Sequence, residues 1–83
     1  MGAARASSMI PLTPTDLEAV ASLTPKEREA LVLYSKGFTI REVATRLSVT
    51  FFTAHDHLKH IYKKLDVGSR AEAAVIAAKA GLV

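Results

Sequence analysis

Residues 39–65 read TIREVATRLSVTFFTAHDHLKHIYKKL, and this stretch decides the fold. Apolar residues recur at helical spacing on both sides of residues 48–50, which predicts a short helix at about 40–47 and a longer one at about 51–65. A helix of about two turns, a turn of three or four residues and a longer helix make up a helix-turn-helix. The stretch therefore predicts this motif at the centre of the chain.

Capping signals mark further helices. One pattern, a hydroxyl residue followed three positions later by glutamate, occurs at Thr24/Glu27, Thr39/Glu42 and Ser69/Glu72. The hydroxyl accepts from a free backbone N–H of the first turn, and the glutamate accepts from the backbone N–H of the cap residue. Gly37 and Gly81 follow helical runs, where a left-handed residue is favoured. Helices are therefore expected at about 25–36 and 70–80, which makes an all-α, four-helix domain.

Residues 1–22 precede this domain and are expected to be a flexible leader or linker. Residues 1–8 are small and polar, which favours disorder. Residues 13–16 have the pattern of a helix start, so a short helix at 14–21 is the alternative for that part. The domain itself is assigned to residues 23–83.

Composition narrows the class of protein. With 83 residues the chain has room for one domain with a thin core. Cysteine is absent, which excludes disulfides and thiolate metal sites and suits a cytoplasmic protein. No apolar run approaches the ~20 residues that cross a bilayer, so no membrane partner is expected. No nucleophile–base pair or phosphate loop is evident, so neither enzymatic activity nor a cofactor is expected.

The net charge of +3 arises from one segment of the chain. Residues 38–70 hold six basic side chains against three acidic ones, and the rest of the chain is balanced. The basic residues are Arg41, Arg46, Lys59, Lys63, Lys64 and Arg70. A local basic excess is typical of a protein with a polyanionic partner, although a solvated helix face gives the same count.

The expected helix at 51–65 has two unlike faces at ~100° per residue. An apolar stripe, assigned to the core, consists of Ala54, Leu58, Ile61 and Leu65. The opposite face carries Phe52, Asp56, Lys59 and Lys63, with His55 and His60 beside it. Because an α-helix fits the major groove and presents its outward side chains to base edges, this face is the candidate DNA reader. Ordinary solvated surface is the alternative.

Individual residues of this helix suggest particular contacts. Lys59 and Lys63 lie one turn apart and suit phosphates or guanine, and Thr50 is expected to expose the helix N-terminus to a phosphate. Asp56 is discordant, since phosphates repel it, unless it accepts from cytosine N4. The pair Phe51-Phe52 suits either packing over the turn or apolar contact with a thymine methyl group.

A metal site is the other interpretation of the histidines. His57 and His60 have workable spacing, but no third ligand is apparent within the helix, so no metal is expected. His57 lies at the margin of the core stripe and is expected to be a packed, hydrogen-bonded structural residue.

From Leu23 to Val83 the chain resembles the LuxR-type helix-turn-helix domain, which ends quorum-sensing regulators and many two-component response regulators. The matching stretches are LTPKERE at 23–29, EVA at 42–44, TAHDHLKHIYKKL at 53–65 and SRAEA at 69–73. They occur in order and without gaps, which makes the resemblance specific.

The resemblance implies a bacterial DNA-binding domain that regulates transcription, with a three-helix core plus a C-terminal helix. It implies groove-facing positions for His55, Asp56 and Lys59. It also implies phosphate contacts from Thr50, Thr53 and the start of the second helix, where Arg41 lies. Double-stranded DNA is the implied partner, bound at inverted repeats by a homodimer, and RNA polymerase is a further candidate.

The C-terminal helix is the implied dimer contact. Ala73, Ala77 and Ala80 fall within a narrow arc and are expected to pack inward. The outward side chains, which form the candidate dimer face, are Val75, Ala78 and Lys79.

Three positions depart from the family pattern. His55 stands where lysine or arginine is usual, which makes a base contact there weaker or dependent on protonation. Ala54 replaces a usual valine and thins the core. Asp66 replaces a usual glycine, which disfavours a left-handed helix stop at that residue and leaves Gly68 as the candidate for the turn.

Two rival functions remain open. A sigma-factor region 4 domain has a similar helix-turn-helix, although the fourth capped helix favours the LuxR type. From a different class, a helical protein-interaction module that has lost DNA binding would also accommodate His55 and Asp56.

Overall fold

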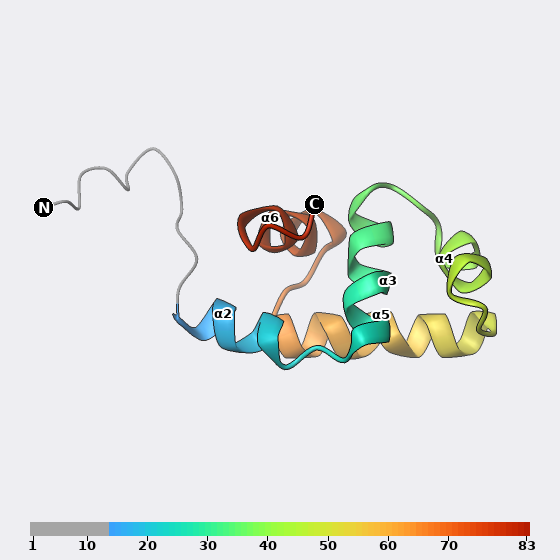
Figure 1. Cartoon of the computed structure of the whole chain (residues 1–83), viewed down its shortest axis with the longest axis horizontal. Coiled ribbons are helices and arrows are strands. Elements are labelled where there is room, and N and C mark those ends of the chain that lie inside the picture. The colour runs from blue at the N-terminus through green and yellow to red at the C-terminus, as the bar shows by residue number, and fades with distance from the viewer. Residues whose placement is uncertain (1–13) are drawn as a thin grey trace, which may run out of the picture.

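The computed structural model describes residues 14–83, and every regular element in that range is an α-helix (Figure 1). The helices are α2 (Pro14–Ala21), α3 (Pro25–Ser35), α4 (Ile40–Leu47), α5 (Phe51–Leu65) and α6 (Arg70–Lys79). The all-α prediction and the four expected helices are confirmed within one residue at their ends. A helix also occupies 14–21, whereas the expected disorder of residues 1–8 lies outside the described residues.

Helix α5 runs along the long axis of the molecule (Figure 1). Helix α3 packs against α4, α5 and α6, α4 packs against α5, and α2 lies against the C-terminal half of α5. Among residues 14–83, the core consists of thirteen buried apolar residues from all five helices and the loop before α3. Burial of this kind stabilises by roughly 25 cal/mol per Å² of apolar surface.

The N-termini follow the capping signals with one change. Thr24 and Thr39 each form a full capping box with Glu27 and Glu42. At α6 the Ser69 hydroxyl accepts from the Glu72 backbone N–H at 3.2 Å. The Glu72 carboxylate, however, accepts from the backbone N–H of Gly68 at 2.7 Å, one residue earlier than the pattern predicts.

The helix ends share one geometry. In α3, α4, α5 and α6 a residue with positive φ follows the helix, and the next backbone N–H bonds to a carbonyl five residues back. The left-handed residues are Gly37, Ser48, Asp66 and Gly81. The expectation that Asp66 avoids this conformation is wrong, because Asp66 adopts φ 55° and Gly68 has no positive φ. Aspartate tolerates the left-handed region better than most residues, which makes the stop possible.

Helix α2 is part of the packed body, since Val20 belongs to the core. The expected division of the chain at residues 22 and 23 stays a prediction. Over residues 14–83, the helices are too short or too polar to span a bilayer.

Candidate nucleic-acid interface

The helix-turn-helix is built from α4, residues 48–50 and α5. Ser48 in the left-handed conformation closes α4, and the Val49 backbone N–H bonds to Ala44 O at 3.0 Å. Lys26 from α3 donates through Nζ to Leu47 O at 3.1 Å and so satisfies a second free carbonyl of α4. The turn is therefore fixed by hydrogen bonds from both its own backbone and a neighbouring helix.

The two faces of α5 are as the periodicity predicts. The apolar stripe is buried, with exposed fractions between 0% and 4% at Ala54, Leu58, Ile61 and Leu65. The side chains opposite are exposed: Phe52, His55, Asp56, Lys59, His60 and Lys63. Helix α5 thus presents a continuous polar surface to solvent, along which Phe52 is the apolar exception.

Thr50 and Thr53 form a small hydroxyl pair at the start of α5. The Thr50 hydroxyl accepts from the Thr53 backbone N–H at 3.1 Å and donates to Thr53 Oγ1 at 3.0 Å. With its oxygen acting as an acceptor, the Thr53 hydroxyl keeps its own proton to donate. The pair combines that donor with the free N–H groups of the helix N-terminus, which together suit an anion.

An aromatic bridge, consisting of Arg41, Phe51 and His55, connects the start of α4 to the first turns of α5. The Arg41 guanidinium lies over the Phe51 ring, 5.5 Å from its centroid. The His55 ring stacks on the same phenyl ring at a centroid distance of 6.3 Å and an interplanar angle of 28°. Phe51 thereby groups two of the predicted site residues.

This role of Phe51 was not predicted from the sequence, although part of the signal was present. Phe51 and His55 are four apart and so share a helix face. Arg41 comes from another helix, and its approach depends on how α4 packs.

His55 and Lys59 also line a hollow of about 280 Å³ with Tyr34, Ile40, Leu58 and Tyr62. Two of these lining residues, Tyr34 and Tyr62, have their hydroxyls 3.4 Å apart. Burial and the hydrogen bond with Tyr34 raise the pKa of Tyr62 to about 12, against a smaller opposing effect of Arg70.

The six basic residues of segment 38–70 differ in whether their side chains contact other parts of the domain. Arg70 donates from Nε to Tyr34 O at 3.0 Å and from Nη2 to Phe38 O at 2.6 Å, and its guanidinium lies over the Tyr34 ring. Arg46 lies over Phe38, 4.2 Å from the ring centroid. Arg70 therefore joins α6 to the end of α3. Its charge alone suggested that it adds to an open basic surface, but it does not.

Lys64 is likewise engaged inside the domain. Its Nζ lies 2.7 Å from Glu27 Oε1 and donates to Ser22 O at 3.2 Å. Burial raises the pKa of Glu27, but the hydrogen bonds from Lys64 and the Thr24 backbone, with the charges of Lys64 and His60, hold it below its usual value. Within residues 14–83, Lys59 and Lys63 form no such ion pair and remain the open cations of α5.

The outward residues of α6 lie on a separate surface. Ala73 and Ala77 are fully buried and Ala80 is half-buried, as expected, while Val75 is 50% exposed. Ala78 is exposed and Lys79 is half-buried. Val75 and other residues of α6 line a hollow together with α2, the C-terminal end of α5 and residues 66 and 67.

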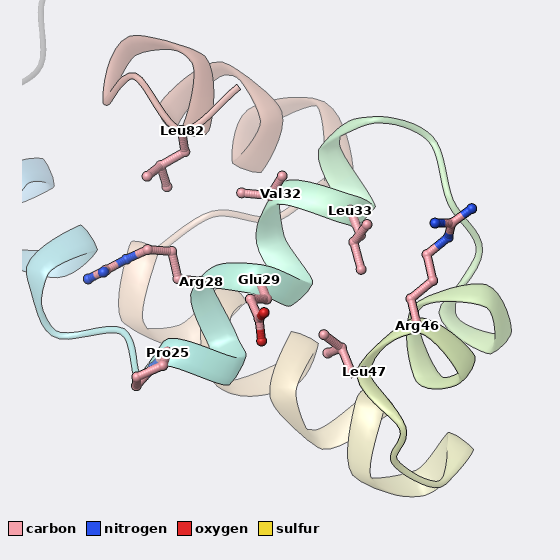
Figure 2. A pocket seen from close by; sticks show the side chains of 8 residues that line it. All are labelled: Pro25, Arg28, Glu29, Val32, Leu33, Arg46, Leu47 and Leu82. Atoms are coloured by element: carbon pink, nitrogen blue, oxygen red, sulfur yellow. The ribbon is translucent and has the colours of Figure 1, made fainter.

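A larger hollow of about 640 Å³ lies between α3, the end of α4 and the C-terminal Leu82. Figure 2 shows Val32, Leu33, Leu47 and Leu82 around it, with Arg28 and Arg46 on opposite sides. No lining residue belongs to α5, so this hollow is distinct from the polar face of the helix-turn-helix.

The histidines do not gather into a metal site in the part of the chain that the structure describes. His57 is half-buried beside the core stripe, as expected, but its ring forms no hydrogen bond with residues 14–83, contrary to expectation.

Comparison with known proteins places this architecture in a family. Residues 21–77 match the family model described as bacterial regulatory proteins, luxR family. The chain is 45% identical over 56 residues to the nitrate/nitrite response regulator protein NarL of Escherichia coli K12, covering 68% of this chain and 26% of that protein. It is 42% identical over 62 residues to the transcriptional regulatory protein LiaR of Bacillus subtilis, covering 75% and 29%.

A third relative is the probable transcriptional regulatory protein SgaR of Hyphomicrobium methylovorum, 36% identical over 76 residues, with 88% of this chain and 36% of that protein covered. The chain thus spans roughly a quarter to a third of the length of these three relatives. No solved structure gives a match. The match to the family model decides against a sigma-factor region 4 domain: the chain belongs to the luxR family of DNA-binding bacterial regulators.

Proposed function

We propose that this domain regulates transcription by inserting α5 into the major groove of specific DNA sites. The observation that carries the proposal is the contrast across α5, where a buried apolar stripe lies opposite an exposed face with two open lysines. Cationic side chains there neutralise phosphates and supply donors to base edges. A protein-interaction module has no need for such a face to be basic.

Sequence readout is assigned to His55, Asp56 and Lys59. Lys59 donates to guanine O6 and N7, and Asp56 accepts from cytosine N4. The stacking of His55 on Phe51 supports a fixed position of its ring beside these two residues. All three side chains are exposed.

Phosphate contacts are assigned to both flanks of α5, together with Lys63 on its outward face. Arg41 lies on the flank of Phe51 and His55, and Thr53 lies about half a helical turn away on the other flank. Thr50 adds the open N-terminus of the helix. A helix in the major groove has one phosphate backbone on each side, so this distribution provides a donor toward each strand.

A homodimer is proposed to form through α6, with Val75, Ala78 and Lys79 at a two-fold axis. Slim alanine side chains allow two helices to approach closely, and two-fold pairing matches an inverted-repeat site. Because the aligned stretches cover only 26% and 29% of these relatives, the domain is proposed to act as the output module of a larger regulator in the cytoplasm, with RNA polymerase as a further partner.

Selection of duplexes from a random library by the 83-residue chain tests the proposal. Sites should be enriched, and their affinity should fall steeply with salt. Lys63→Ala should reduce the salt slope by about one, as expected for a lost phosphate contact. Arg28→Ala is the matched control, because Arg28 is an exposed cation on the hollow away from α5 and should leave the slope unchanged. Absence of enrichment at low salt would contradict DNA binding and favour the protein-interaction module.

A further inference from the structure

Phe52 is the most exposed large apolar side chain of residues 14–83, at 79%. It lies in the first turn of α5 beside Phe51, which is only 39% exposed. The two rings meet edge to face, with centroids 5.9 Å apart and an interplanar angle of 84°. Neither core packing nor helix capping requires a phenyl ring in this place.

The position of Phe52 on the helix associates it with the candidate reading face. Phe52, Asp56, Lys59 and Lys63 follow one another at steps of four, three and four residues, so they share one side of α5. In helix-turn-helix proteins the N-terminal residues of the second helix contact base edges. Phe52 therefore occupies the end of the helix that enters the groove, and it can contribute only apolar surface there.

Phe51 gives this ring a rigid support. The Phe51 ring contacts both the Arg41 guanidinium and the His55 ring, and Phe52 packs against it edge to face. A supported aromatic ring has little conformational entropy to lose on binding. The pair thus presents a preformed apolar surface rather than a mobile side chain.

The major groove offers one apolar feature to such a surface, the C5-methyl group of thymine. We propose that Phe52 is a specificity-determining residue that contacts a thymine methyl group in each half-site. This inference rests on the proposed insertion of α5 into the major groove and adds a base preference that Asp56 and Lys59 do not provide.

The test removes the methyl group alone. In a selected duplex, each thymine is replaced in turn by deoxyuridine, which keeps every donor and acceptor of the base. At one or two thymines per half-site the affinity of the wild-type chain should fall roughly three- to fourfold, the value expected for one buried methyl group. The other thymines should tolerate the replacement.

Phe52→Ala decides whether Phe52 makes this contact. The variant should bind thymine and deoxyuridine duplexes equally at those positions, with an affinity for the thymine duplex at or below that of the wild type for deoxyuridine. Leu17→Ala, which removes an exposed apolar side chain from α2, should retain the wild-type ratio. Both variants should keep the wild-type helical circular dichroism, because both side chains are exposed.

The outcomes distinguish failure of the proposed role of Phe52 from failure of the proposed DNA binding. Enriched sites whose thymine-to-deoxyuridine ratio is one for the wild type, or unchanged in Phe52→Ala, overturn the role of Phe52 and leave DNA binding intact. An equal loss on both duplexes in Phe52→Ala also overturns methyl contact and points to another use of the ring. Absence of any enriched site overturns the proposed function, and the role of Phe52 with it.

Discussion

The two ends of α5 use their side chains differently. At the C-terminal end, Lys64 is bonded to Glu27 and Ser22, and Tyr62 meets Tyr34. At the N-terminal end, Phe52, Asp56 and Lys59 are exposed to solvent. One helix therefore has an anchoring end, where Lys64 and Tyr62 hold the domain together although Lys63 stays open, and a reading end, which is free to contact a ligand. Residues of the same type, such as Lys59 and Lys64, have different roles because their neighbours differ.

Loss of the Glu27 carboxylate should have the largest effect on the anchoring end. Glu27→Ala removes a capping-box bond, a hydrogen bond to Lys64 and a buried charge, and it should lower the free energy of unfolding by about 2–4 kcal/mol. Urea unfolding followed by circular dichroism measures this. A loss below about 0.5 kcal/mol, the range of ordinary surface substitutions, would show that the anchoring end does not depend on Glu27.

Because the pKa of Glu27 is lowered, its contribution to the free energy of unfolding should depend on pH. A carboxyl whose folded-state pKa lies below its ordinary value of 4.5 stabilises the fold at neutral pH, and that contribution disappears as pH falls through the folded-state value. Glu27→Gln lacks this titration. The stability difference between wild type and Glu27→Gln should therefore shrink as pH falls from 7 to about 3. A difference that is constant with pH would argue against the ion pair.

Val75→Glu tests whether α6, which follows the anchoring end of α5, forms the proposed dimer surface. The substitution would place like charges across the proposed two-fold axis. Cooperative binding to a duplex with two half-sites should be lost, while affinity for a single half-site and helical circular dichroism stay nearly unchanged. Gel-shift titration on both duplexes provides the measurement. Surviving cooperativity would mean that dimers form through another surface.

Asp66→Gly, at the residue that ends α5, should have the smallest effect. Asp66 holds φ 55°, which costs a residue with a side chain roughly 1 kcal/mol and glycine little. The free energy of unfolding should rise by up to about 1 kcal/mol, with DNA affinity unchanged. A decrease would show that the Asp66 side chain stabilises the stop beyond its backbone strain.

Periodicity and capping patterns predicted the helices and both faces of α5, because these depend on residues a few positions apart. The anchoring contacts were not predictable in this way. Lys64 and Arg70 find their partners 37 and 36 residues away, so their roles follow from how the helices pack. The left-handed stop at Asp66 was missed because the local cost of a side chain is smaller than the benefit of ending α5 there.

A matched pair of lysine variants tests the division of α5 most directly. Lys59→Ala should weaken binding to a selected duplex about tenfold and leave the free energy of unfolding within about 0.5 kcal/mol of wild type. Lys64→Ala should do the reverse, lowering the free energy of unfolding by about 1–2 kcal/mol while the folded protein binds as tightly as wild type. If both variants lose the same affinity, or if Lys64→Ala alone weakens binding, the two ends of α5 do not have separate roles.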